Sequence, residues 1–91
     1  MKLFNKLEEL EKEMKQHEEM QDYWLNDEHY NLEKSEEYEE LADITYKKVY
    51  EATKEIATKI VEITKFQVTF SIAMQMVQTK RETLKELLKN Y

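Results

Sequence analysis

Any chemistry in this chain has to come from carboxylates, hydroxyls, basic side chains and two histidines. The 91 residues include 20 Asp and Glu and 14 Lys and Arg, but no Cys, Gly or Pro. Without Cys there is no thiolate nucleophile, no zinc–thiolate site and no disulfide. Without Gly there is no phosphate-binding loop of the kind that needs backbone free of a Cβ. We therefore expect a non-enzymatic chain with no catalytic residue and no cofactor.

His17 and His29 are the only histidines, and neither sits in a metal-binding pattern. His17 follows Glu13 by one helical turn. Metal centres in helical bundles pair Glu-x-x-His segments from more than one helix, and neither that motif nor His-Glu-x-x-His occurs. We expect His17 to be a half-buried or surface residue, and we expect no metal site. Ser71 has no histidine near it in sequence, so a serine nucleophile is not indicated either.

The elements that would position these groups are helices. Apolar or half-polar residues recur in steps of four and three over the first part of the chain, which is typical of one helix face. They are Leu3, Leu7, Leu10, Met14, His17, Gln21 and Trp24. The spacing predicts a helix over 3–25. Asn26 and Asp27 can then form a turn without Gly, and 26–34 is the predicted connection.

Ser35 is the predicted N-cap of the next helix, because its hydroxyl can accept an orphan backbone N–H. From there the same spacing continues for more than forty residues. The predicted seam is Ala42, Tyr46, Val49, Thr53, Ile56, Ile60, Ile63, Gln67, Phe70, Met74, Val77, Arg81, Leu84 and Leu88. Polar Thr53, Gln67 and Arg81 on this seam would fix the register of packing.

A break in this long pattern is predicted at Thr64-Lys65, giving helices over 35–64 and 66–89. Alternation over 66–72 also resembles a strand, but no second segment alternates to pair with it. The expected fold is all-α, a small antiparallel bundle forming one domain over 1–91. Three helices and a hairpin with a very long second helix both stay open, as does a dimer.

The charge is concentrated in one window. Residues 18–43 hold eleven acids and one base, Lys34, whereas 44–91 hold nine bases and five acids. An acidic window repels a phosphate backbone, so direct nucleic-acid binding is disfavoured. No apolar stretch is long enough to span a membrane, and the start of the chain lacks a signal-peptide apolar region. We expect a cytoplasmic chain with no membrane partner.

One carboxylate pair suggests an enzyme. The segment Glu39-Glu40-Leu41-Ala42-Asp43-Ile44 resembles the Glu-x-x-Asp helix of the all-α MazG-type nucleotide pyrophosphohydrolases. That resemblance implies four carboxylates holding Mg²⁺ against a triphosphate, with Glu40 and Asp43 as the second pair and Glu8 and Glu11 as the first. It covers about six residues, and Lys47-Lys48 interrupts the apolar run expected after the aspartate, so it ranks third among the interpretations.

The favoured interpretation is a protein that acts by binding another protein. Tyr and Trp, which are enriched at binding interfaces, cluster between residues 23 and 50 and overlap the acidic window. We expect Trp24 and Tyr46 to be core residues. The predicted contact residues are Asp22, Tyr23, Asp27, Glu28, Tyr30, Glu33, Glu36, Glu37, Tyr38 and Glu40.

Carboxylates on a rigid helix can imitate nucleic acid and block a basic groove. In size and charge the chain resembles small phage or mobile-element proteins that antagonise host enzymes in this way. We therefore expect an inhibitor of a larger protein, for example a nucleic-acid-processing enzyme. The alternative is a structural protein that assembles with copies of itself through the long seam. An acidic window can also be only a solvated helix face.

Overall fold

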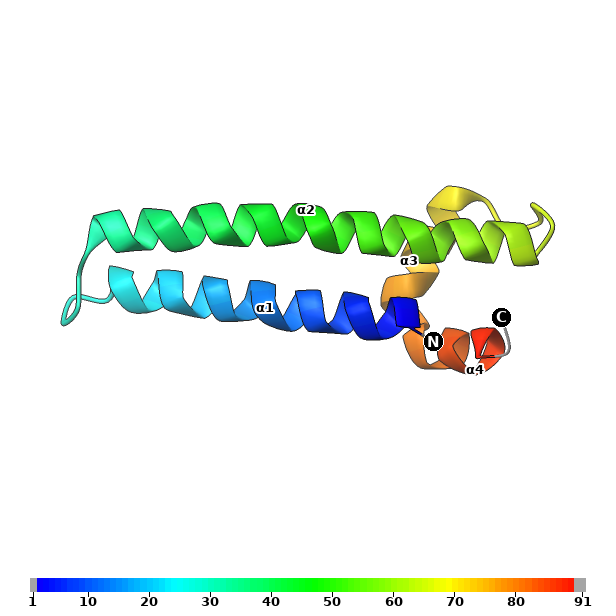
Figure 1. Cartoon of the computed structure of the whole chain (residues 1–91), viewed down its shortest axis with the longest axis horizontal. Helices are drawn as coiled ribbons and strands as arrows, with labels where there is room; N and C mark the ends of the chain where they lie inside the picture. The colour runs from blue at the N-terminus through cyan, green and yellow to red at the C-terminus, as the bar shows by residue number, and fades with distance from the viewer. Residues whose placement is uncertain (1, 90–91) are drawn as a thin grey trace. The chain divides into compact units, whose positions relative to one another are not determined.

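The computed structural model describes residues 2–89, and all regular structure in this range is helical. There are four helices: α1 (Lys2–Leu25), α2 (Leu32–Ile63), α3 (Phe70–Thr79) and α4 (Arg81–Leu88) (Figure 1). The all-α prediction is confirmed, although the described residues form four helices where either three, or two with a very long second helix, were expected. Residues 1, 90 and 91, which the expected domain includes, lie outside the described part. The expectation of one domain stays a prediction.

Two compact units divide the chain, and we describe each by itself. The first, Glu8–Val49, contains fifteen acids and five bases, and we call it the acidic unit. The second joins Met1–Leu7 to Tyr50–Tyr91, contains nine bases and five acids, and is called the basic unit. The charge asymmetry of the sequence therefore coincides with the division of the fold.

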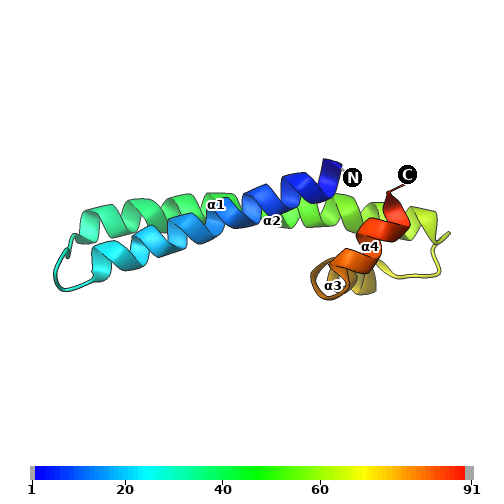
Figure 2. The same ribbon diagram turned by 90° about the horizontal axis from the view of Figure 1, so that it is seen from below.

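The acidic unit is a pair of helical segments. Residues 8–25 of α1 and 32–49 of α2 lie side by side in both views (Figures 1 and 2). The rings of His17 and Tyr38 approach to 6.3 Å between the two segments. The buried positions on α2 in this unit are small or short: Ser35, Ala42, Thr45 and Val49. On α1 the predicted face from Leu10 to Trp24 is half-buried.

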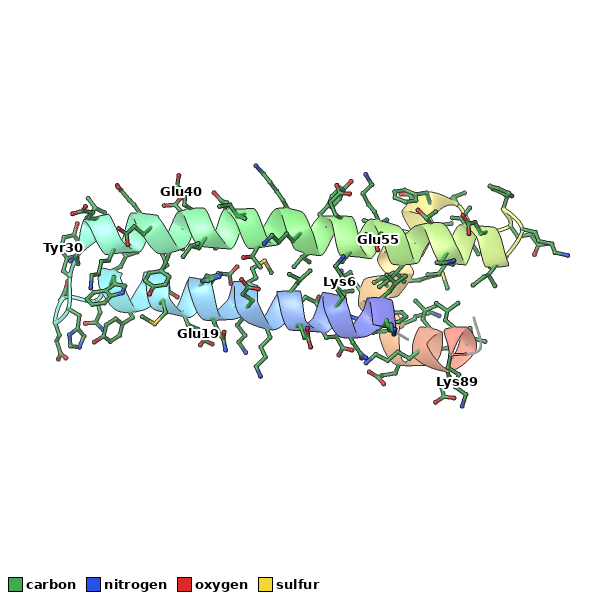
Figure 3. All side chains as sticks on the ribbon, viewed as in Figure 1. Lys6, Glu19, Tyr30, Glu40, Glu55 and Lys89 are labelled. Carbon is green, nitrogen blue, oxygen red and sulfur yellow. The ribbon has the colours of Figure 1, made fainter. Side chains whose placement is uncertain are left out.

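The basic unit has the more completely buried core. It combines the first turns of α1, the last turns of α2, and both short helices. Its buried side chains are Phe4, Leu7, Ala52, Thr53, Ile56, Ala57, Ile60, Ala73, Val77, Leu84 and Leu88. At the surface of this core Lys6 and Glu55 face each other, 3.9 Å between Nζ and Oε1 (Figure 3). Both are about half exposed, so this ion pair contributes little to stability.

The start of α2 differs from the prediction that Ser35 is its N-cap. The cap is Asn31, whose side-chain oxygen accepts the backbone N–H of Lys34 at 3.1 Å. Ser35 instead lies inside the first turn, with its N–H bonded to the Asn31 carbonyl at 3.0 Å. Asn and Ser are about equally good caps, so cap preference alone does not distinguish Asn31 from Ser35.

The end of α2 lies close to the predicted break at Thr64-Lys65. Lys65 and Phe66 have φ angles of 54° and 65°, a left-handed conformation that reverses the chain without Gly. Helix α3 then begins after Thr69, whose side-chain oxygen accepts the Ile72 N–H at 3.3 Å. The stretch expected as one helix over 66–89 is divided at Lys80, which ends α3 and starts α4.

On α2 the row of buried residues also differs by one position from the predicted seam. Tyr46, expected in the core, is 60% exposed, and Thr45 is buried in its place. The Thr45 hydroxyl donates to the Leu41 carbonyl at 2.8 Å, so its burial leaves no donor unpaired. Gln67 lies exposed in the turn after α2 and does not belong to a seam. No helix within residues 2–89 is long and apolar enough to cross a membrane.

Candidate protein-binding surface

The outward side of α2 in the acidic unit carries a group of six carboxylates. They line one open hollow of about 490 Å³: Glu33, Glu36, Glu37, Glu39, Glu40 and Asp43. Glu40 points away from α1 (Figure 3). Within residues 2–89 none of the six takes part in an ion pair. We call this group the α2 acidic face.

The charge density of this face is of the same order as that of a nucleic acid. Residues 33–43 span about 15 Å of helix, so six charges correspond to one per about 2.5 Å. Duplex DNA carries one charge per about 1.7 Å along its axis. A basic groove that binds a phosphate backbone would therefore meet a comparable density of negative charge along α2.

A second feature of the acidic unit is an aromatic cluster beside the connection at 26–31. The Tyr23 ring packs edge-on against Trp24, with 4.9 Å between centroids, and stacks on His29 at 4.6 Å. The Lys34 ammonium lies 4.4 Å from the centre of the Trp24 ring. This contact occupies the one base that the sequence places between residues 18 and 43. The connection therefore presents negative charge around exposed aromatic rings.

The backbone of the connection is held by several hydrogen bonds. The Asn31 N–H donates to the Trp24 carbonyl at 2.8 Å, and the Glu28 N–H donates to the Asn26 side chain at 3.0 Å. The second bond is the turn chemistry expected of Asn26. Tyr30 projects at the end of this connection (Figure 3).

All ten predicted contact residues lie in the acidic unit, in two groups. Asp22, Tyr23, Asp27, Glu28 and Tyr30 are exposed in or beside the connection. The others lie on α2. Glu33, Glu36, Glu37 and Glu40 line the α2 acidic face, whereas Tyr38 is half-buried against His17.

Several surface residues were missed by the sequence reasoning. Glu39 and Asp43 complete the α2 acidic face, and their i, i+4 spacing relative to each other could have indicated this. Leu25 and Leu32 are exposed at the two helix ends that flank the connection. Their type predicts burial, so the sequence held no signal for them.

The two chemical alternatives gain no geometric support. Within residues 2–89 there is no group of three or more carboxylate or imidazole side chains placed to hold a metal ion. Of the carboxylates in the pyrophosphohydrolase interpretation, Glu40 and Asp43 line the outward α2 hollow, and Glu8 and Glu11 are not among its lining residues. His17 lies 3.4 Å from Glu13, one turn away on its own helix.

The basic unit has an open hollow of its own, about 480 Å³. It is lined by side chains of both signs: Leu3, Glu51, Lys54, Glu55, Thr58, Lys59 and Glu62. Two of its carboxylates already meet a base, Glu51 with Lys54 at 3.8 Å and Glu55 with Lys6. A ligand of either charge would have to displace these partners, so we do not assign it as a site.

Comparison with known proteins identifies no relative: no family model, no curated protein sequence and no solved structure matches the chain.

Proposed function

We propose that this protein acts by binding a larger protein, and that the α2 acidic face is its main contact surface. The partner presents a basic groove of the kind that holds a phosphate backbone. By occupying this groove the protein works as an inhibitor, without any reaction of its own. Small phage and mobile-element proteins that antagonise host enzymes act in this way, and the chain resembles them in size and charge.

The observation that carries the proposal is the set of six carboxylates without counter-ions. Holding so many like charges along 15 Å of one helix opposes folding, because neighbouring acids at i, i+3 and i, i+4 repel each other. A solvated helix face gains nothing from this arrangement, whereas a surface that must imitate phosphates requires it. Long-range attraction would also speed association with a basic partner.

The arrangement of the whole chain is part of the same proposal. We propose an antiparallel bundle in which α1 and α2 form the rigid support for the acidic face, with a dimer as the structural alternative. A specific observation favours keeping that alternative: Leu41 and Ile44 are 42% and 50% exposed on α2. Pairing with another chain would cover them.

The experiment that tests the proposal is affinity capture from a lysate of the source cell with the tagged full chain. It is repeated with excess duplex DNA and with excess RNA. We expect a nucleic-acid-binding protein to be retained and the competitor to displace it. Purified partner should then lose its own activity when the chain is added at equimolar amount. A captured protein that resists both competitors would contradict the imitation of phosphates.

A further inference from the structure

The connection between α1 and α2 exposes four large apolar side chains. Tyr23, Leu25, Tyr30 and Leu32 are each between 43% and 61% exposed. We call these four residues the turn patch. Exposed apolar groups gathered within a few residues of one another are typical of a protein-binding site, because solvent contact is unfavourable for them.

The Tyr23 ring of the turn patch and the backbone of the connection are already held in place before any partner binds. Tyr23 is fixed between Trp24 and His29, and the Trp24 carbonyl accepts the Asn31 N–H across the connection. A pre-ordered aromatic surface loses little side-chain entropy on binding. The indole N–H of Trp24 is buried and has no acceptor within residues 2–89.

The charges around the patch specify the sign of its partner. Asp22, Asp27, Glu28 and Glu33 are exposed beside it, and Lys34 lies over the Trp24 ring. An occupant must therefore combine an apolar group with positive charge. A second acidic unit is a poor occupant, because each one carries a net charge of −10 from its side chains.

The turn after α2 in the basic unit has the required combination. Phe66 is 80% exposed, more than any other large apolar residue within residues 2–89. Lys65 precedes it, and both residues hold the left-handed conformation at φ 54° and 65°. Such a conformation is unfavourable for residues other than Gly, and here it holds an aromatic ring in solvent. From Ile63 to Arg81 the chain has three bases and no acid.

We propose that the turn patch of one copy docks on the Lys65-Phe66 turn of a second copy. The protein then associates with itself through the acidic unit of one copy and the basic unit of the next. The contact joins two different surfaces and does not use the predicted long seam. Of the α2 acidic face it involves only Glu33, which lies at one end of that face. The contact therefore goes beyond the proposed function and does not depend on it. Since the surfaces are small, the association is weak, with a dissociation constant of roughly 10 to 100 μM.

The test is sedimentation equilibrium of the full chain from about 5 to 500 μM. The wild-type mass should rise above 11.2 kDa with concentration. Tyr30→Ser and Phe66→Ser should each weaken association about tenfold or more, as loss of a central aromatic contact does. Two matched controls should leave association unchanged: Tyr46→Ser, which is as exposed as Tyr30, and Leu87→Ser, which is 62% exposed in the basic unit. Far-UV circular dichroism checks that helicity is retained.

Mixing the two defective variants distinguishes this contact from a symmetric one. The Tyr30→Ser chain keeps an intact Lys65-Phe66 turn, and the Phe66→Ser chain keeps an intact turn patch. An equimolar mixture should therefore form a 1:1 complex with the wild-type affinity, although association of each variant alone is weakened about tenfold or more. A mixture that stays monomeric, or a wild-type mass that remains at 11.2 kDa at 500 μM, would overturn the proposal. Neither result bears on capture of a partner through the α2 acidic face.

Discussion

Replacement of Ile56 by Ala should destabilise the protein strongly, and the same replacement at Ile44 should not. Both residues lie on α2, but Ile56 is fully buried in the basic unit and Ile44 is 50% exposed. The change removes three carbons, worth about 2.5 kcal/mol of transfer free energy when fully buried. The cavity left behind raises this to about 3–4 kcal/mol at Ile56.

At Ile44 only about half of the transfer term applies, and no cavity forms. Alanine also has the higher helix propensity, by about 0.5 kcal/mol. The expected loss at Ile44 is therefore below about 1 kcal/mol. Urea unfolding followed by far-UV circular dichroism measures both values. Similar losses for the two variants would refute the placement of the core.

The same titrations test the expectation of a single domain. Trp24 is the only tryptophan and lies in the acidic unit, so its fluorescence reports that unit, whereas circular dichroism reports both. Helices α1 and α2 continue from one unit into the other without a break. We therefore expect Ile56→Ala to lower the urea midpoint equally by both probes. A fluorescence midpoint that stays at the wild-type value would show that the units unfold separately.

Three further substitutions test local features. Thr69→Ala should lower the free energy of unfolding by about 1 kcal/mol through loss of the α3 cap, measured by urea unfolding, whereas Thr58→Ala, an exposed mid-helix hydroxyl, should change it by less than about 0.5 kcal/mol. Lys65→Gly should raise the free energy of unfolding by about 0.5–1 kcal/mol, because Gly adopts a positive φ freely. The thermal midpoint should rise accordingly, and a lower midpoint would contradict this. Trp24→Phe should cost less than about 1 kcal/mol in urea unfolding, since it also removes a buried, unpaired N–H; a loss above about 2 kcal/mol would contradict this expectation.

The helices were predictable where spacing and composition agreed. The face from Leu3 to Trp24 predicts a helix close to the observed α1, and the turn at Asn26 follows from its side-chain chemistry. The end of α2 near Thr64 was predictable because β-branched residues weaken the helix there. In each case a local property of the chain determines the structure.

The remaining features depend on packing, which spacing does not resolve. Steps of three and four allow either Thr45 or Tyr46 to follow Ala42 on a helix face, and the structure buries the smaller residue. The division at Lys80 has no Gly or Pro to mark it. Ser35 and Asn31 are equivalent as caps, so sequence alone could not choose between them.

The sequence predicted the negative charge of the candidate site, but it did not predict how the site residues divide between two surfaces. Acidic residues beside aromatic ones indicated a binding surface, and the structure divides these residues between α2 and the connection. Exposure of Leu25, Leu32 and Phe66 could not be foreseen, because large apolar residues are normally buried.

The central claim is that the α2 acidic face binds a basic protein. The most direct test compares two triple charge reversals of equal net change. One replaces Glu36, Glu37 and Glu40 by Lys on that face. The control replaces Glu9, Glu18 and Glu19, exposed acids of α1, by Lys; Glu19 points away from α2 (Figure 3).

Partner capture is measured for wild type and both variants side by side, with helicity checked by circular dichroism. We expect the α2 reversal to abolish capture and the α1 reversal to retain it, because binding depends on where the charges lie and not only on their sum. Equal capture by both variants, or equal loss in both, would contradict the account.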